Sequence, residues 1–245
     1  MKKRVFTVPL VIVLVLGAAL VVYAVSEGQL KEIGDLPYTL QQLFTRKATI
    51  FGEVREEAVA PETVTAAVSV GGKSSRVNSK GEYEIKDVSP GLRTLRVESS
   101  DHETFEKEVE IVKGRNRADI PISLTPEETL RRWFDAYKQE KYDEAYEYVH
   151  PEDKAQVSED EYVEFFKNFI NSRKLKIVSV DVGKAKMLDK WTNTATQKVY
   201  PGIAEIETTV IFSSTASGSA KQSEEKVTMH LAKTDRQWKG FWTKP

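Results

Sequence analysis

The sequence has no cysteine among its 245 residues. This absence excludes a disulfide framework, a thiolate zinc site, a cysteine nucleophile and a lipid-modified N-terminal cysteine. An excess of one charge is also missing, because 36 Lys and Arg residues against 37 Asp and Glu residues leave a formal net charge of -1. That balance argues against a polycationic protein, so no nucleic-acid partner is predicted.

The familiar motifs of catalysis are missing too. The chain carries no glycine-rich phosphate loop, no Gly-x-Ser-x-Gly elbow, no His-Glu-x-x-His helix and no EF-hand loop. Adjacent acids such as Glu152 and Asp153 point in different directions on a helix, and solvated helix ends explain them better than a catalytic pair. The sequence therefore predicts no catalytic residue, no cofactor and no metal site.

The N-terminus is predicted to be a transmembrane anchor or a signal sequence, residues 1–25. Lys2, Lys3 and Arg4 precede an uncharged run from Val5 to Val25. As a helix this run would be about 32 Å long, enough to cross a bilayer core of about 30 Å. The positive-inside bias then places the N-terminus in the cytoplasm and the rest outside the cell membrane. A signal cleaved near Ala24 would instead give a secreted protein.

Residues 26–45 are predicted to be a juxtamembrane stalk. Gly28, Gly34 and Pro37 interrupt it, and its apolar residues have the spacing of short amphipathic turns. These turns could lie on the lipid headgroups or pack on the following domain. Packing is favoured, because Lys and Arg do not crowd their polar side.

From residue 46 to about 124 the hydrophobic period is two. Ile50, Gly52 and Val54 alternate with polar neighbours, and similar short runs follow, separated by turns at Gly81 and Gly91. The pattern predicts an all-β antiparallel sandwich of about seven strands. The two glycines are predicted to occupy turn positions, and His102, in a loop beside acids, is predicted to face solvent.

The order of strands and turns in this stretch resembles the carboxypeptidase regulatory-like domain, a transthyretin-like sandwich. The residues that carry the resemblance are Ile50 to Val54, Ala67 to Val70, Asn78 to Ile85, Val88 to Gly91 and Leu95 to Val97. Domains of this kind are accessory modules without catalytic residues, and some of them bind sugars or proteins.

Residues 125–245 begin with helical periods. Thr125, Pro126 and Glu128 form a helix start, and Ser158 to Glu161 forms a capping box. Three amphipathic stripes follow from spacings of three and four residues: Leu130, Trp133, Phe134 and Tyr137; Tyr142, Ala145, Tyr146 and Val149; Tyr162, Phe165, Phe166 and Phe169. These spacings predict three helices, each with one apolar face.

Strand patterns occupy the remainder of the chain. Leu175 to Val182, Ala204 to Phe212, Val227 to Leu231 and Gln237 to Thr243 are predicted to be strands. Met187 to Tyr200 is predicted to supply another, broken by Thr192, Asn193 and Thr194. On the longest one, Ala204, Ile206, Val210 and Phe212 share one face, and Ile203, Glu205, Glu207, Thr209 and Ile211 share the other. Three helices packed on a bent antiparallel sheet give an α+β domain.

This order resembles the nuclear transport factor 2-like superfamily. Ala136 to Tyr146 and the closing Trp238 to Trp242 carry the resemblance, which is strongest to small extracytoplasmic versions in bacterial membrane-anchored proteins, including the one before the transpeptidase part of some penicillin-binding proteins. It implies a cone-shaped pocket between helices and sheet. Its predicted lining is the set of inward aromatic residues Trp133, Tyr137, Tyr146, Tyr162 and Phe166.

The remaining polar candidates are predicted to lie away from such a pocket. Asp135 is one position off an apolar stripe and should be solvated. His150 precedes Pro151 at a helix end, which favours a capping or surface role. His230 alternates with Met229 and Leu231, so its side chain should lie on the opposite face of the strand.

Charge is distributed unevenly within this domain. Residues 127–164 contain 13 acids and 5 bases, which gives -8, whereas residues 165–245 contain 7 acids and 14 bases, which gives +7. Internal complementarity explains this division. Alternatively, a basic patch attracts an anionic partner such as a cell-wall polymer, a lipid headgroup or a protein. Its candidate residues are Arg173, Lys174, Lys176, Lys184, Lys186 and Lys190.

Together these features predict a membrane-anchored, extracytoplasmic, non-catalytic binding or scaffold protein of the cell envelope. Its partners would be the lipid bilayer through residues 5–25 and an envelope protein or an anionic polymer. A homodimer through an open sheet face bearing Trp191 or Trp238 is a further hypothesis. The alternative is a small pocket enzyme of hydrolyase or isomerase type that uses tyrosine hydroxyls. A buried acid or histidine facing a cavity of several hundred Å³ would favour this alternative.

Overall fold

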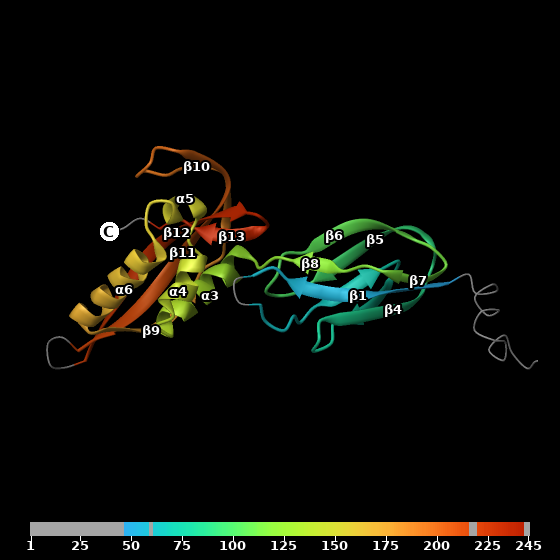
Figure 1. Ribbon diagram of the computed structural model, residues 1–245, viewed down its shortest axis with the longest axis horizontal. Coiled ribbons are helices and arrows are strands. Elements are labelled where there is room, and N and C mark those ends of the chain that lie inside the picture. The colour runs from blue at the N-terminus through green and yellow to red at the C-terminus, as the bar shows by residue number, and fades with distance from the viewer. Residues whose placement is uncertain (1–46, 59–60, 216–219, 243–245) are drawn as a thin grey trace, which may run out of the picture.

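The computed structural model describes residues 47–58, 61–215 and 220–242. The predicted membrane segment and stalk lie outside these residues, and the helices within them are all too short or too polar to cross a bilayer. The described chain is elongated and consists of two parts (Figure 1). Strands β1 to β8 form one end of it, and helices α3 to α6 with strands β9 to β13 form the other.

The first part is a sandwich of two four-stranded sheets. One sheet contains β4 (Glu82–Val88), β1 (Ala48–Glu56), β7 (Gly114–Arg117) and β8 (Ile120–Ile122). The other contains β3 (Lys73–Arg76), β2 (Ala67–Val70), β5 (Gly91–Glu98) and β6 (Phe105–Ile111). Alternate residues of β1 are buried, as the period of two predicts.

Two details differ from the predicted sandwich. It has eight strands rather than about seven, and β7 and β8 run parallel to β1 rather than antiparallel. The parallel pairing arises because β6 belongs to the opposite sheet, so the chain crosses between sheets before it joins β1. Gly81 and Gly91 do have positive φ values of 81° and 111°, which glycine adopts with little cost.

Four helices begin the second part, one more than predicted. They are α3 (Pro126–Lys138), α4 (Tyr142–Glu147), α5 (Pro151–Lys154) and α6 (Glu159–Arg173). The Thr125 side chain accepts a hydrogen bond from the Glu128 amide, and Ser158 forms the predicted capping box with Glu161. The additional helix, α5, is a single turn and has no apolar period that a sequence pattern could reveal.

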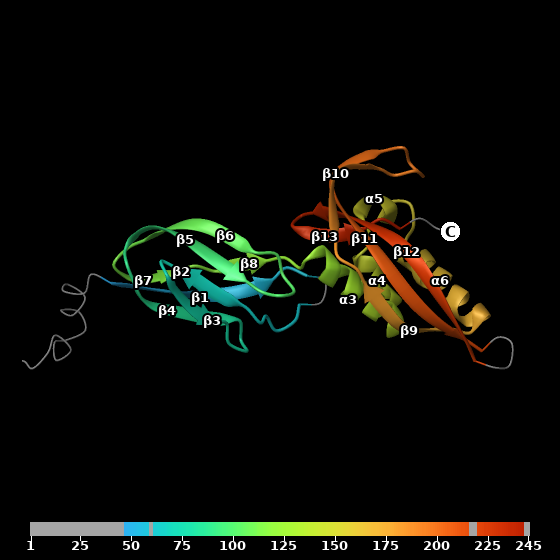
Figure 2. The ribbon, with the colours of Figure 1, turned by 180° about the vertical axis from the view of Figure 1, so that it is seen from behind.

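A five-stranded antiparallel sheet follows, in the order β10 (Lys186–Thr192), β11 (Val199–Ser214), β12 (Lys221–Thr234) and β13 (Gln237–Gly240), with β9 (Leu175–Val182) also paired to β11. Ala204 and Ile206 pack with the helices, whereas Ile203 packs with Tyr200 on the other face, as the alternation predicts. The stretch from Met187 to Tyr200 is broken where predicted, because β10 ends at Thr192 and a turn follows. Tyr200 belongs to β11. Figure 2 shows β9, β11 and β12 from the side opposite the helices.

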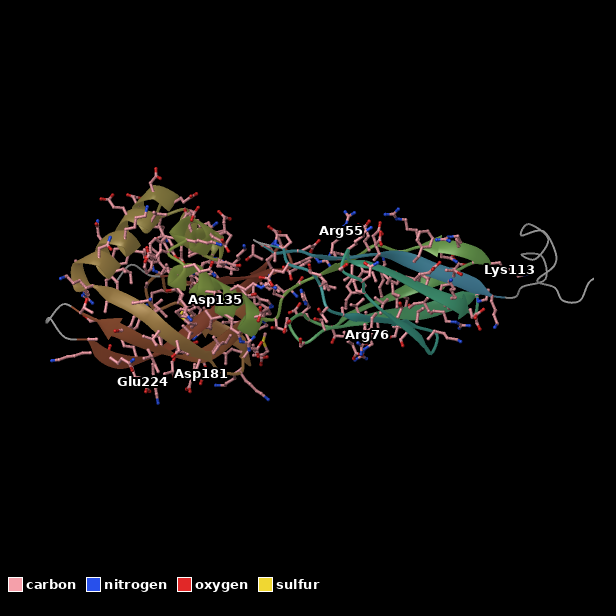
Figure 3. The ribbon with its side chains drawn as sticks, turned by 90° about the horizontal axis from the view of Figure 1, so that it is seen from below. Arg55, Arg76, Lys113, Asp135, Asp181 and Glu224 are labelled. Atoms are coloured by element: carbon pink, nitrogen blue, oxygen red, sulfur yellow. The ribbon has the colours of Figure 1, made fainter. Side chains whose placement is uncertain are left out.

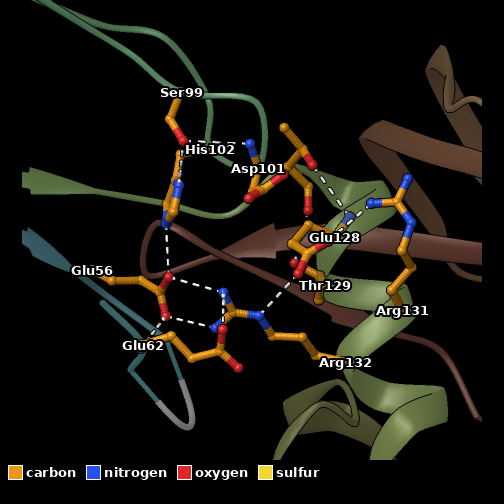
Figure 4. A network of polar contacts seen from close by, with 10 residues as sticks. Glu56, Glu62, Ser99, Asp101, His102, Glu128, Thr129, Arg131 and Arg132 are labelled. Atoms are coloured by element: carbon orange, nitrogen blue, oxygen red, sulfur yellow. Dashed lines mark hydrogen bonds and ion pairs between the residues drawn. The ribbon is translucent and has the colours of Figure 1, made fainter. Parts of the chain in front are cut away.

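A buried polar network joins the two parts (Figure 4). Glu56 on β1 accepts hydrogen bonds from Arg132 on α3 at 2.7 and 3.0 Å, and its Oε2 lies 2.7 Å from His102 Nε2. The side chains of Glu56 and His102 are 1% and 4% exposed. The prediction that His102 faces solvent is therefore wrong, because Glu56, which is far away in sequence, provides a buried hydrogen-bond partner.

A second contact lies beside this network. Glu103 accepts a hydrogen bond from Trp238 Nε1 at 2.9 Å and also pairs with Lys233 of β12. Trp238 is buried in the core beneath the helices. It therefore does not lie on an open sheet face as predicted, because its ring packs on α3 and its indole N–H reaches the sandwich.

Candidate functional site

A groove of about 380 Å³ lies between the helices and the sheet of the second part. Helices α3 and α6 supply one wall, and the inner face of β11 and β12 supplies the floor. The lining is almost wholly apolar and comprises Trp133, Phe134, Tyr137, Phe165, Phe166, Phe169, Ile170, Ile177, Val210, Phe212, Val227, Met229, Phe241 and Trp242, with Glu225 and Thr228 as its polar members.

The helix stripes explain why aromatic rings gather here. In α6, positions 162, 165, 166 and 169 lie on one face because side chains three and four residues apart are neighbours on a helix. The rings of Phe166 and Tyr137 are 4.7 Å apart between centroids, and those of Phe166 and Tyr162 are 4.8 Å apart. The first pair joins α6 to α3, whereas the second lies within α6, and together they form an aromatic wall of the groove.

Hydroxyl groups behind this wall are engaged with one another. The hydroxyls of Tyr137 and Tyr162 form a short hydrogen bond, and Trp133 Nε1 donates to Tyr162 Oη at 3.3 Å. Burial raises the pKa of both tyrosines, which keeps the hydroxyls protonated at neutral pH. Neither phenol is therefore poised to act as a base.

Trp242 lines the groove and is held there through its backbone. Its N–H donates to Asp153 Oδ2 on α5 at 2.8 Å, and its ring meets that of Tyr162 edge-on at 5.0 Å. Burial raises the pKa of Asp153, although the hydrogen bond from Trp242 acts in the opposite direction. The small helix α5 thus positions a residue that belongs to the groove.

Few ionisable side chains line the groove. Within the described residues, Glu225 is the only ionisable carboxylate that lines it, and Glu225 is exposed at the rim. No group of three or more His, Cys, Asp or Glu side chains in the described ranges could hold a metal ion. An apolar lining of this kind suits an apolar ligand, and its described members include no histidine and no buried carboxylate.

The structure divides the predicted pocket residues into two sets. Trp133, Tyr137 and Phe166 line the groove. Tyr146 and Tyr162 do not, because Tyr162 is fully buried behind the wall and Tyr146 donates its hydroxyl hydrogen to the Val157 carbonyl at 2.7 Å. The sequence did not assign Trp242 or the floor residues to a pocket, although the Phe165 and Phe169 stripe was visible.

The remaining histidines lie elsewhere. A capping or surface position at the end of the preceding helix was predicted for His150. The side chain is instead buried, caps the N-terminus of α5 and stacks on Phe241 with 4.3 Å between ring centroids. Burial lowers the pKa of His150. His230 does not line the groove and stacks on Trp191 at 4.3 Å. Asp135 is exposed on α3 and labelled in Figure 3.

The six basic residues predicted as one patch do not gather in one place. Lys176 on β9 pairs with Ser213 of β11, whereas Lys186 and Lys190 on β10 pair with Glu205 and Pro201. Eight or more residues of β11 separate these positions, which is about 26 Å or more along a strand. Arg173 and Lys174 are close to Lys176 in sequence, and Lys184 is close to Lys186. The candidates therefore form two separate groups.

A second hollow, of about 570 Å³, lies on the outer face of β1, β4 and β7. Several of its charged side chains are paired: Arg115 contacts Glu84 within the hollow and lies over the Phe51 ring, and Arg117 pairs with Asp119 outside the lining. Figure 3 shows Arg55 and Arg76 projecting from the same sandwich. This open, charged surface provides weaker grounds for a ligand site than the apolar groove.

Comparison with known proteins identifies no family for the chain. No protein-family model and no curated protein matches it. Two solved complexes of interface-mutant type II cohesin with X-dockerin from Acetivibrio cellulolyticus are each 23% identical over 31% of this chain, with TM-scores of 0.29 and 0.28, and the chain spans only 58% and 56% of theirs. A protein from Bacteroides uniformis ATCC 8492, provisionally described as carbohydrate-binding, is 12% identical over 75% of this chain and 99% of its own, with a TM-score of 0.28.

Proposed function

We propose that this chain is a non-catalytic binding protein of the cell envelope that holds an apolar ligand in the groove between α6 and the sheet. The observation that carries the proposal is the composition of the lining, in which aromatic and aliphatic side chains from α3, α6, β11 and β12 converge. A volume of about 380 Å³ falls within the range of small-ligand sites.

The lining also restricts the ligand. Burial of an apolar surface in the groove is worth about 25 cal/mol per Å², so a ring system or a short hydrocarbon chain gains most from it. Glu225 at the rim favours a ligand whose polar end is neutral or cationic. A ligand with an anionic group at that end would meet the carboxylate and bind less tightly.

The proposed location follows from the N-terminal sequence. Residues 5–25 would anchor the chain in the cell membrane, with residues 46–245 on the extracytoplasmic side. Strand β1 begins at the end of the sandwich that is remote from the second part (Figure 1). In this arrangement the sandwich is a spacer that holds the groove away from the lipid surface.

The proposed modules agree with this role. Residues 46–124 would be an accessory domain of the carboxypeptidase regulatory-like type, and residues 125–245 a domain of the nuclear transport factor 2-like type with its pocket between helices and sheet. Neither assignment supplies a catalytic residue, and fold alone does not confer chemistry.

Photochemical labelling of the full chain in lipid nanodiscs tests the proposed function. A benzophenone that carries an amine should give adducts concentrated in residues 159–173 and 225–242. Phe169→Glu, which puts a charge into the groove, should reduce these adducts about tenfold or more, since about 1.5–3 kcal/mol of apolar contact is lost. Leu92→Glu is the matched control, because Leu92 is 60% exposed on the sandwich. Equal labelling of the two variants would refute the proposal.

A further inference from the structure

The groove is bordered by an unpaired strand edge. β12 spans Lys221–Thr234, and β13 pairs with only its last part, from Leu231 to Thr234. Phe241 continues along β12 for one more residue, since its N–H donates to the His230 carbonyl at 2.9 Å. Trp242 then turns away toward Asp153. Within the described chain, residues 221–229 therefore pair with β11 alone.

The register fixes which backbone groups point outward from this edge. Thr234 and Gln237 flank a two-residue turn, and His230 bonds to Phe241, so the even-numbered residues of β12 direct their N–H and C=O groups toward the β13 side. Farther along the strand, Gln222, Glu224, Lys226 and Thr228 direct theirs toward the open edge. Their odd-numbered neighbours point back to β11.

Side chains alternate in the same way. Glu225, Val227 and Met229 face the groove and line it, and Val227 is 38% exposed. Glu224 and Lys226 lie on the other face of the sheet, with side chains 58% and 79% exposed and 3.9 Å between their charged atoms. A strand added at this edge would thus meet an apolar groove on one face and an acid followed by a base on the other.

We infer that the groove takes an extended segment of a partner protein, which pairs antiparallel with residues 222–228 of β12 and inserts alternate apolar side chains beside α6. This inference rests on the proposed function, because it names the apolar ligand as side chains of a peptide. Charge complementarity defines the segment: an acid opposite Lys226, a base opposite Glu224, and aliphatic residues between them. Strand addition of this kind derives affinity from the backbone and specificity from alternate side chains.

A designed probe, Ac-Thr-Leu-Glu-Val-Lys-Leu-NH2 with a fluorophore, tests the inference by anisotropy on the full chain in nanodiscs. Its Thr, Glu and Lys amides would bond to β12, whereas its Leu and Val amides would point away. N-methylation at Glu should weaken binding about tenfold or more through the lost hydrogen bond and the steric clash, and N-methylation at Val should be tolerated. Exchange of Glu and Lys should weaken binding about two- to fivefold.

A protein variant checks the same edge. Lys226→Pro removes an outward N–H without removing a hydrogen bond to β11. It should therefore weaken binding of the peptide and leave binding of the amine-bearing benzophenone unchanged. If the benzophenone labels the groove but the peptide is indifferent to the position of N-methylation, the inference is wrong and the proposed function stands. If neither probe binds, both are wrong. If the mass of the protein in solution is that of a dimer formed through β12, the edge belongs to a second copy of the chain and the inference is overturned.

Discussion

Arg132 on α3 donates from its two terminal nitrogens to separate oxygens of Glu56 on β1, at 2.7 and 3.0 Å. The pair joins two parts of the molecule that have separate cores. Both charges are largely removed from water, with side-chain exposures of 11% and 1%. The orientation of the groove relative to the sandwich therefore depends on a buried ion pair.

Removal of one partner should be costly. Glu56→Ala leaves Arg132 and His102 without their shared acceptor, and breaking a buried pair typically lowers the free energy of unfolding by about 3–5 kcal/mol. Urea denaturation followed by circular dichroism measures the loss. Glu106→Ala is the matched control, because its pair with Arg96 is half exposed and worth about 1 kcal/mol or less. Equal losses in the two variants would show that the contact between the parts is incidental.

The same carboxylate should make stability depend on pH. Burial raises the pKa of Glu56, but hydrogen bonds from His102 and Arg132 outweigh it and hold the pKa below its usual value of 4.5. The contribution of Glu56 is therefore fully present above pH 4.5 and is lost as the pH falls through the lower folded value. Unfolding free energies measured from pH 7 to pH 3 should fall more steeply for the native chain than for Glu56→Gln, and parallel curves would contradict this.

Local signals in the sequence predict three of the four described helices and much of the sheet. Thr125 and the Ser158 capping box mark helix starts through hydrogen bonds within four residues, and the alternation from Ala204 to Phe212 identifies the two faces of β11. Such features depend on neighbours in the chain. Strand β7 escapes prediction because Gly-Arg-Asn-Arg has no apolar residue, and its pairing with β1 comes from a partner more than 60 residues away.

Only part of the candidate site could be predicted from the sequence, because the rest depends on residues that are distant in the chain. The apolar stripes of α3 and α6 predict the wall of the groove. The floor depends on the register of β12, and the position of Trp242 depends on its hydrogen bond to Asp153. The burial of His102 likewise depends on Glu56, 46 residues earlier. A pattern within one segment cannot specify which distant segment covers it.

Close packing beside the groove gives a further prediction. A Cβ at Gly240 would lie 1.9 Å from Trp133 Cζ3, and Trp133 is 1% exposed, so its ring cannot move aside freely. Gly240→Ala should lower the free energy of unfolding by about 1–3 kcal/mol or more and displace Trp133 into the groove, which reduces benzophenone labelling. Gly202→Ala is the control. Its φ of 61° makes alanine unfavourable by about 1–2 kcal/mol, but nothing lies within 4 Å, so labelling should be unchanged.

Variants of Asp153 separate the effect of its hydrogen bond to Trp242 from the effect of its own charge. Asp153→Ala leaves the Trp242 N–H without its acceptor, which should cost about 1–3 kcal/mol and weaken groove labelling. Asp153→Asn keeps an acceptor and should retain labelling. Burial raises the pKa of Asp153, so ionisation of this carboxyl group at higher pH lowers the free energy of unfolding of the native chain. The Asn variant should therefore match the native chain at low pH and become more stable than it as the pH rises. If Asn and Ala variants lose labelling equally, Asp153 does not act through that hydrogen bond.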